Sequence, residues 1–130
     1  MASDRRVQRL TSSIVRESAT FIARRLNDPR IGPVTVTGAK LSTDLSHCKV
    51  LVMPSGDEKQ RKITMMGLQS ALPALQRHLA EALDIRFAPQ VTVEVDAGMI
   101  KAREMDEIFR KIREEGEKKQ SQADTPLSTE

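Results

Sequence analysis

The residues with the clearest capacity for chemistry are arginines and lysines that gather in a few short stretches of the chain. Residues 1–30 hold seven arginines against the three acids Asp4, Glu17 and Asp28, which gives this segment a net charge of +4. Guanidinium groups bind phosphate oxygens through paired hydrogen bonds, so a local basic excess is typical of nucleic-acid partners. A solvated helix surface has a similar composition. Charge alone therefore leaves both interpretations open.

No arrangement of side chains predicts catalysis. The sequence contains neither a glycine-rich phosphate-binding motif nor a G-x-S-x-G nucleophile motif. His47 and His78 are 31 positions apart, with no other Cys or His at the spacing of metal ligands. The single Cys48 excludes an internal disulfide and is more typical of a small buried residue than of a reactive thiol. We therefore expect no enzyme, no metal, no cofactor and no small-molecule substrate.

Aromatic residues that could stack on bases are also missing. The chain has no Trp and no Tyr, and its three Phe fit core positions. This argues against the modes of single-strand recognition that stack bases on aromatic side chains. Recognition of backbone and shape by basic residues remains, and that mode suits folded RNA.

Length and composition predict one soluble domain. The 130 residues suffice for a single core. Residues 117–130 lack apolar periodicity and read as a disordered polar tail, which leaves residues 1–116 for the domain. No apolar run is long enough to cross a membrane, and no signal sequence is visible at the start. We expect a cytoplasmic protein that is a monomer when free.

The apolar spacing predicts which elements carry the basic residues. A long amphipathic helix from Asp4 to about Asn27 places Arg5, Arg9 and Arg16 on one side, within roughly 40° of one another and opposite the apolar stripe. Prolines and glycine in residues 27–33 end this helix. Alternation then predicts a hairpin of two strands, with a bulge at Gly38 where the apolar residues change parity and a turn at residues 42–45.

The next stretch, residues 57–95, holds a leucine stripe of helical period that is interrupted by Pro73. Proline removes a backbone donor and clashes with the preceding turn, so we expect two helices joined at a kink. Lys59, Arg61 and Lys62 lie at the start of the first of them, Arg77 lies on the second, and Arg86 precedes a strand over residues 91–95. A last amphipathic helix around Met105–Ile112 should pack on the sheet or the first helix and end before Gly116.

This order predicts an α+β fold in which helices cover one face of a three-stranded sheet, in the sequence α-β-β-α-kink-α-β-α. It is similar to the type II KH domain, an RNA-binding fold whose G-x-x-G loop clamps a single strand. No two glycines of this chain are three apart, so the G-x-x-G loop is missing.

The chain resembles the ribosome-binding factor A family over about residues 5–113. Three stretches carry this resemblance: Asp28-Pro29-Arg30-Ile31-Gly32, the turn at residues 42–45 and the passage Ile85-Arg86-Phe87-Ala88-Pro89. In that family an Ala-x-Gly kink replaces the loop, and here it reads Ala71-Leu72-Pro73.

The resemblance implies a bacterial assembly factor that binds the small (30S) ribosomal subunit and its 16S rRNA. It implies support for late maturation and for processing of the rRNA 5′ end without cutting RNA, with the greatest importance in the cold. The alternative is a basic protein-interaction module without direct RNA contact. The positions carried over as family motif are Asp28, Pro29, Arg30, Gly32, Ala71, Pro73 and Pro89. The residues expected to contact rRNA phosphates are Arg5, Arg9, Arg16, Arg30, Arg77 and Arg86, with Lys59, Arg61 and Lys62 as a second patch.

Overall fold

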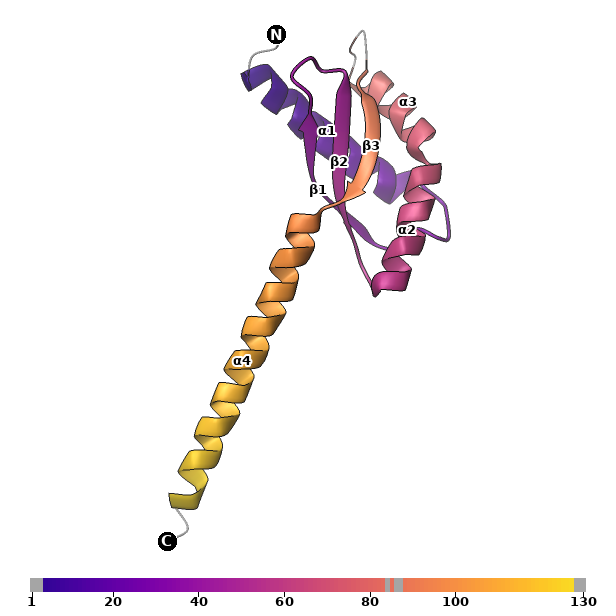
Figure 1. Cartoon of the computed structure of the whole chain (residues 1–130). Helices are drawn as coiled ribbons and strands as arrows, with labels where there is room; N and C mark the ends of the chain where they lie inside the picture. The colour runs from indigo at the N-terminus through magenta and orange to yellow at the C-terminus, as the bar shows by residue number, and fades with distance from the viewer. Residues whose placement is uncertain (1–3, 84, 86–87, 128–130) are drawn as a thin grey trace. The chain divides into compact units, whose positions relative to one another are not determined.

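The described residues form four helices and three strands (Figure 1). The structure is a computed structural model that describes residues 4–83, 85 and 88–127, with side chains as far as residue 117. The chain divides into two compact units, Met1–Asp96 and Ala97–Glu130. The elements are α1 (Asp4–Arg24), β1 (Val34–Leu41), β2 (His47–Pro54), α2 (Glu58–Ser70), α3 (Leu72–Ala82), β3 (Gln90–Val95) and α4 (Ala97–Leu127).

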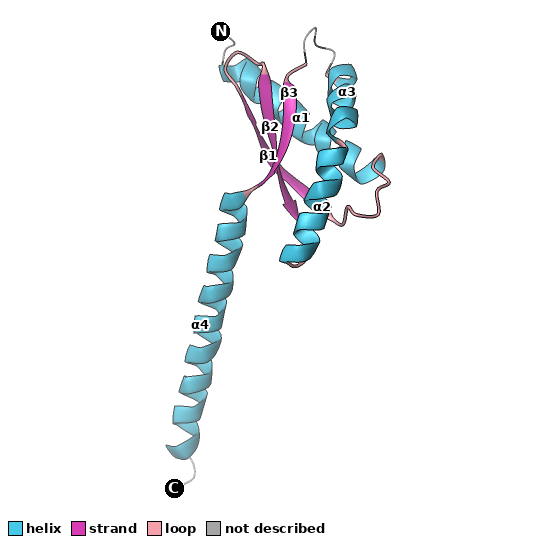
Figure 2. Cartoon of the chain, turned by 45° about the vertical axis from the view of Figure 1, so that its right-hand side comes forward, coloured by secondary structure: helices cyan, strands magenta, loops and turns pink. Residues whose placement is uncertain are grey.

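The three strands form one mixed sheet in the order β1-β2-β3. β1 pairs with β2 in antiparallel orientation, and β2 pairs with β3 in parallel orientation, because the two helices between them return the chain to the same end of the sheet. Figures 1 and 2 show α1, α2 and α3 on one face of this sheet. The α+β fold class and the element order expected from the sequence are confirmed.

The core lies between that sheet face and the three helices. Cys48, Val50 and Val52 alternate along β2 and are at most 2% exposed, as the period-2 pattern requires. Ile14 from α1 and Leu79 from α3 pack against them in the same cluster. Burial raises the pKa of the Cys48 thiol to about 11, so the sulfur behaves as a small apolar group rather than a nucleophile.

The hairpin between β1 and β2 has both features that the sequence indicated. The strand register shifts between Val36 and Gly38, which leaves Thr37 as the extra residue of the bulge. The hydroxyl of Thr37 donates to Asp96 Oδ2 at 2.7 Å, so the bulged residue ties β1 to the chain just after β3. In the turn, Leu45 adopts a left-handed φ of 61°. The Asp44 carboxylate accepts hydrogen bonds from the hydroxyls of Ser46 at 2.6 Å and Ser42 at 2.7 Å.

The kink is present where Pro73 predicts it. α2 ends at Ser70, and α3 begins at Leu72 with Pro73 in its first turn. Two glutamine side chains fasten the helices to the β3 edge of the sheet. Gln69 of α2 donates to Val93 O at 3.0 Å, while Gln76 of α3 donates to Pro89 O at 2.6 Å and accepts from Val91 N at 2.8 Å. The joint is therefore held by β3 as well as by the proline.

The last helix is longer than the sequence predicts. α4 runs through Gly116 to Leu127, so the predicted end before Gly116 is wrong; a lone glycine weakens a helix by only about 1 kcal/mol. The large apolar side chains of α4 are 49–57% exposed: Met105, Ile108, Phe109 and Ile112. Their packing on the sheet or α1 stays a prediction. The division into a domain of residues 1–116 and a disordered tail of residues 117–130 stays a prediction.

Candidate nucleic-acid interface

The first basic surface is the exposed side of α1. Arg5, Arg9 and Arg16 are all exposed, and we call these three residues the α1 ridge. The apolar side of the same helix buries Ile14, Phe21 and Ile22 in the core, which leaves the arginines on the opposite side. Within the residues that the structure describes, none of the three arginines is held by an ion pair or a side-chain hydrogen bond. Their guanidinium groups are available to an external anion.

A polar contact joins α1 to α3 beside this ridge. His78 Nε2 lies 3.1 Å from Glu17 Oε2, and the His78 ring stacks on Phe21 with centroids 5.0 Å apart. Arg16 precedes Glu17 in the chain, and the exposed Arg77 precedes His78. The contact therefore brings the segments that carry Arg16 and Arg77 to the same helix crossing.

The second basic surface lies at the start of α2. Asp57 caps this helix by accepting from Gln60 N at 2.8 Å, and Gln60 Oε1 accepts from Asp57 N at 3.0 Å. This capping box supplies negative charge and acceptors at the helix start, where Lys59 and Lys62 are exposed and Arg61 is half-buried. Lys62 also forms an exposed ion pair with Glu58 at 3.5 Å.

Arg30 already has a carboxylate partner. Its Nη2 and Nε donate to the Asp28 carboxylate at 2.6 and 3.1 Å, and its backbone N–H donates to Asp28 Oδ1 at 2.9 Å. These hydrogen bonds from Arg30 hold the pKa of Asp28 below its usual value, and Asp28 raises the pKa of Arg30. An external phosphate must therefore share Arg30 with Asp28, which lowers the net charge that Arg30 presents.

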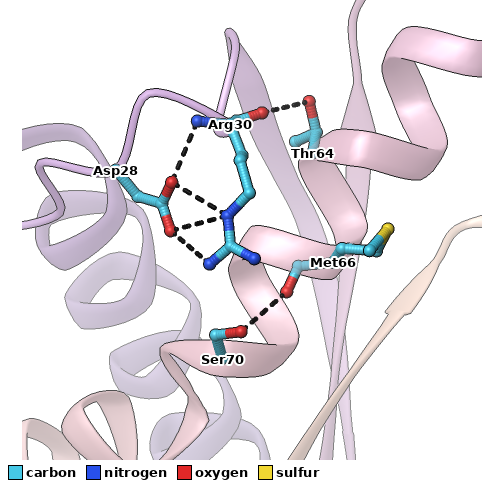
Figure 3. A network of polar contacts seen from close by, with 5 residues as sticks. All are labelled: Asp28, Arg30, Thr64, Met66 and Ser70. Carbon is cyan, nitrogen blue, oxygen red and sulfur yellow. Dashed lines mark hydrogen bonds and ion pairs between the residues drawn. The ribbon is translucent and has the colours of Figure 1, made fainter.

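The segment Asp28–Gly32 is fastened to the middle of α2 (Figure 3). Thr64 of α2 donates to Arg30 O at 3.5 Å and accepts from Gly32 N at 3.3 Å. Gly67, one turn further on, leaves room for the loop, because a Cβ at this position would lie 2.6 Å from Ile31 Cγ1. Figure 3 shows the Arg30 side chain extending from the loop toward α2, on the side where Met66 and Ser70 lie. Arg30 therefore lies beside the middle of α2, whereas Lys59, Arg61 and Lys62 lie in its first turns; we call these four residues the α2 patch.

Of the remaining predicted positions, Pro73 and Pro89 belong to neither basic surface. Arg86 lies outside the described residues. Pro89 is fully buried, which fits a structural role in the passage to β3. Beside the kink lies an open pocket of about 520 Å³, and the described residues that line it are all uncharged: Ser46, Leu72, Pro73, Gln76, Ala88, Gln90 and Val91.

Sequence reasoning missed the residues that position Arg30. Thr64 and Gly67 read as ordinary members of a helix, although a glycine inside a helical pattern often marks a close approach of another segment. Nothing in the sequence indicated that Gln69 and Gln76 bind the backbone of β3, because polar residues seven positions apart on a helix are normally solvated. The Asp57-x-x-Gln60 capping box was visible in the sequence and predicts the helix start.

The part of the chain that the structure describes contains no group of three or more His, Cys, Asp or Glu side chains arranged to hold a metal ion. Nor do these described residues include a helix that is long and apolar enough to cross a membrane.

Comparison with known proteins identifies relatives of this chain. Residues 6–109 match the family model described as ribosome-binding factor A. A protein of Halothermothrix orenii named ribosome-binding factor A is 35% identical over 112 residues, which cover 86% of this chain and 92% of that protein. The crystal structure of ribosome-binding factor A from Thermus thermophilus matches with a TM-score of 0.60 and 27% identity, covering 68% of this chain and 92% of that chain.

A second structural match concerns the same factor in a complex. A homology model of T. thermophilus ribosome-binding factor A, fitted into the cryo-EM map of a 30S–RbfA complex, gives a TM-score of 0.55 and 27% identity. The match covers 65% of this chain and 88% of that chain.

Proposed function

The chain belongs to the ribosome-binding factor A family, and from this membership we propose that it binds the small ribosomal subunit and its rRNA as an assembly factor. The observation that carries the proposal is the family match over residues 6–109, together with the similarity to a relative fitted into a 30S–RbfA complex. The two exposed basic surfaces support direct contact with RNA, because phosphate contacts supply much of the affinity of such complexes.

The α1 ridge is the first proposed contact with rRNA phosphates. Its three arginines are exposed and lie opposite the buried side of α1. Along a helix, Arg5 and Arg9 are about 6 Å apart in rise and Arg16 lies about 10 Å beyond Arg9. A row of this length spans several phosphates of one RNA backbone. Arg77 extends the surface across the α1–α3 crossing.

The α2 patch is the second proposed contact. Lys59 offers the strongest free charge there, since Lys62 and Arg30 share their charges with Glu58 and Asp28. The patch should therefore contribute fewer full phosphate contacts than the α1 ridge. Its role in the proposal is to orient the domain, with the Asp28–Gly32 loop and α2 acting as one rigid unit. Arg86 completes the proposed set.

The action we propose is binding without catalysis or a cofactor. A single copy docks on folded rRNA and holds an immature subunit in one arrangement until a later factor releases it. This supports late maturation and processing of the rRNA 5′ end in the cytoplasm, with the greatest effect in the cold, where misfolded RNA helices rearrange slowly.

Co-sedimentation with small subunits tests this function. The protein should pellet with immature small subunits, and mild nuclease treatment that removes exposed rRNA should release it. If the protein stays bound after the rRNA that it protects has been digested, it contacts a ribosomal protein instead, and the alternative of a basic protein-interaction module without direct RNA contact is correct. Failure to bind subunits at low salt would contradict both.

A further inference from the structure

α4 carries a stripe of large, exposed apolar side chains. Met105, Ile108, Phe109 and Ile112 are spaced three, one and three residues apart, so they form one stripe along the helix. Each of these side chains is 49–57% exposed. An isolated helix is marginally stable in water, and most of its stability comes from packing of its apolar side. Burial of the stripe against a partner surface would therefore stabilise α4.

The charges beside the stripe indicate what that partner is. On one side of it lie Glu104 and Lys111, and on the other side lie Asp106 and Arg113. Both pairs are seven residues apart, hence on the same side of the helix, and in both the acid precedes the base. Within the described residues, none of the four has an ion pair or a side-chain hydrogen bond.

We propose that α4 binds a second copy of itself as an antiparallel helix pair centred between Ile108 and Phe109. Antiparallel pairing around a two-fold axis brings Ile108 of one chain against Phe109 of its partner, and Met105 against Ile112. Residues on one side of the stripe then face the same side of the partner helix. Glu104 faces Lys111 of the second copy and Asp106 faces its Arg113, and each contact occurs twice, which gives four opposite-charge pairs.

A third pair of charges fits the same arrangement. Lys101 and Glu115 lie at opposite ends of the stripe, and their midpoint falls within one residue of the midpoint between Met105 and Ile112. In the antiparallel pair they lie near one another at both ends of the contact.

The opposite orientation of the two helices is disfavoured by the same charges. In a parallel pair in register, each side of the stripe faces the other side of the partner helix. Glu104 would then lie near Asp106 of the second copy, and Lys111 near Arg113, so that all these contacts join like charges. The pattern thus selects the antiparallel pair.

The pairing is weak and depends on concentration. Four apolar side chains on one helix make an interface at the small end of the specific range, so dissociation should occur between micromolar and millimolar chain concentrations. This departs from the expectation that the free protein is a monomer. A single copy can still act on a subunit, because dilution separates the two chains of the pair.

Sedimentation velocity of the full chain over that concentration range tests the proposal. The wild-type protein should pass from monomer to dimer. Glu104→Lys and Lys111→Glu each turn two attractive contacts into repulsive ones, and each should weaken self-association by about tenfold or more. An equimolar mixture of these two variants should associate again, because the lysine introduced at position 104 of one chain then faces the glutamate introduced at position 111 of the other.

Arg110→Glu is the matched control, because it makes the same charge change as Lys111→Glu on the side of α4 away from the stripe. It should leave the dissociation constant within about twofold of wild type. A wild-type chain that stays monomeric at every concentration overturns the proposal and leaves the stripe to another surface of the chain or to a different partner. A mixture of Glu104→Lys and Lys111→Glu that associates no better than either variant alone also overturns it, as does a control that weakens association as much as Lys111→Glu.

Discussion

Substitution of Gly67 by alanine should destabilise the domain, although the same change inside a helix is normally favourable. Alanine gains about 1 kcal/mol over glycine in a helix interior. At position 67, however, the new Cβ would lie 2.6 Å from Ile31 Cγ1 and 3.4 Å from Arg30 Cβ. Ordinary contact begins near 3.4 Å, so the loop has to move away from α2.

The size of the effect follows from these two opposing terms. Overpacking of this kind costs about 1–3 kcal/mol. Moving the loop also weakens the bond from Gly32 N to Thr64 Oγ1, which is already 3.3 Å long; loss of such a bond costs about 1 kcal/mol. After the gain in helix propensity of about 1 kcal/mol, we expect a net loss of about 1–3 kcal/mol, which corresponds to a fall in Tm of roughly 4–24 °C for a domain of this size.

Thermal unfolding followed by circular dichroism measures this change. Gly116→Ala is the matched control, since Gly116 also lies within a helix and nothing lies within 4 Å of the point that its Cβ would occupy; it should leave the transition of the globular domain unchanged. Addition of Ile31→Ala to Gly67→Ala removes the clash, so the two substitutions together should cost less than the sum of their separate costs by about 1 kcal/mol. A rise in Tm for Gly67→Ala would refute the close approach of the loop to α2.

Three further predictions concern the kink and the hairpin. Gln76→Ala removes both bonds to the β3 backbone and should lower the free energy of unfolding by about 1–3 kcal/mol in urea titrations, whereas an unchanged midpoint would show that water replaces the side chain. Pro73→Ala should keep two separate helices, because Gln69 and Gln76 still bind β3, and change stability by no more than about 1 kcal/mol; one straight helix over residues 58–82 in its solution structure would disprove this. The hydroxyls of Ser46 and Ser42 lower the pKa of Asp44 from 3.8 to about 2, so its stabilising effect is complete above the higher value and is lost as the pH falls toward the lower one. Asp44→Ala should make stability less dependent on pH in that window, and an equally steep acid transition would count against the turn network.

The elements and their order could be predicted because each rests on local patterns. The period of the leucine stripe, the proline within it and the change of parity at Gly38 report backbone geometry directly. The contacts that position Arg30 could not be predicted in the same way. Thr64 and Gly67 act on residues more than thirty positions away, and nothing in a single sequence pairs a helix glycine with a distant loop.

The candidate site shows the same division between local and distant information. The exposure of Arg5, Arg9 and Arg16 follows from helical period alone, and the structure agrees. The ion pair of Arg30 with Asp28 is local as well, but a carboxylate two positions away can as easily face solvent. The partner surface of the α4 stripe could not be predicted in this way, because an amphipathic helix predicts burial without saying which surface buries it.

The salt dependence of binding to small subunits tests the central claim most directly, namely that the α1 ridge contacts rRNA phosphates. For the double variant Arg9→Ala and Arg16→Ala, the slope of log K against log salt should become shallower by about two units, with weaker binding to every subunit tested. The matched control is the pair Arg103→Ala and Arg110→Ala on α4, which should keep the wild-type slope. An unchanged slope and affinity for the α1 double variant would show that the ridge faces away from the RNA and would contradict the proposed interface.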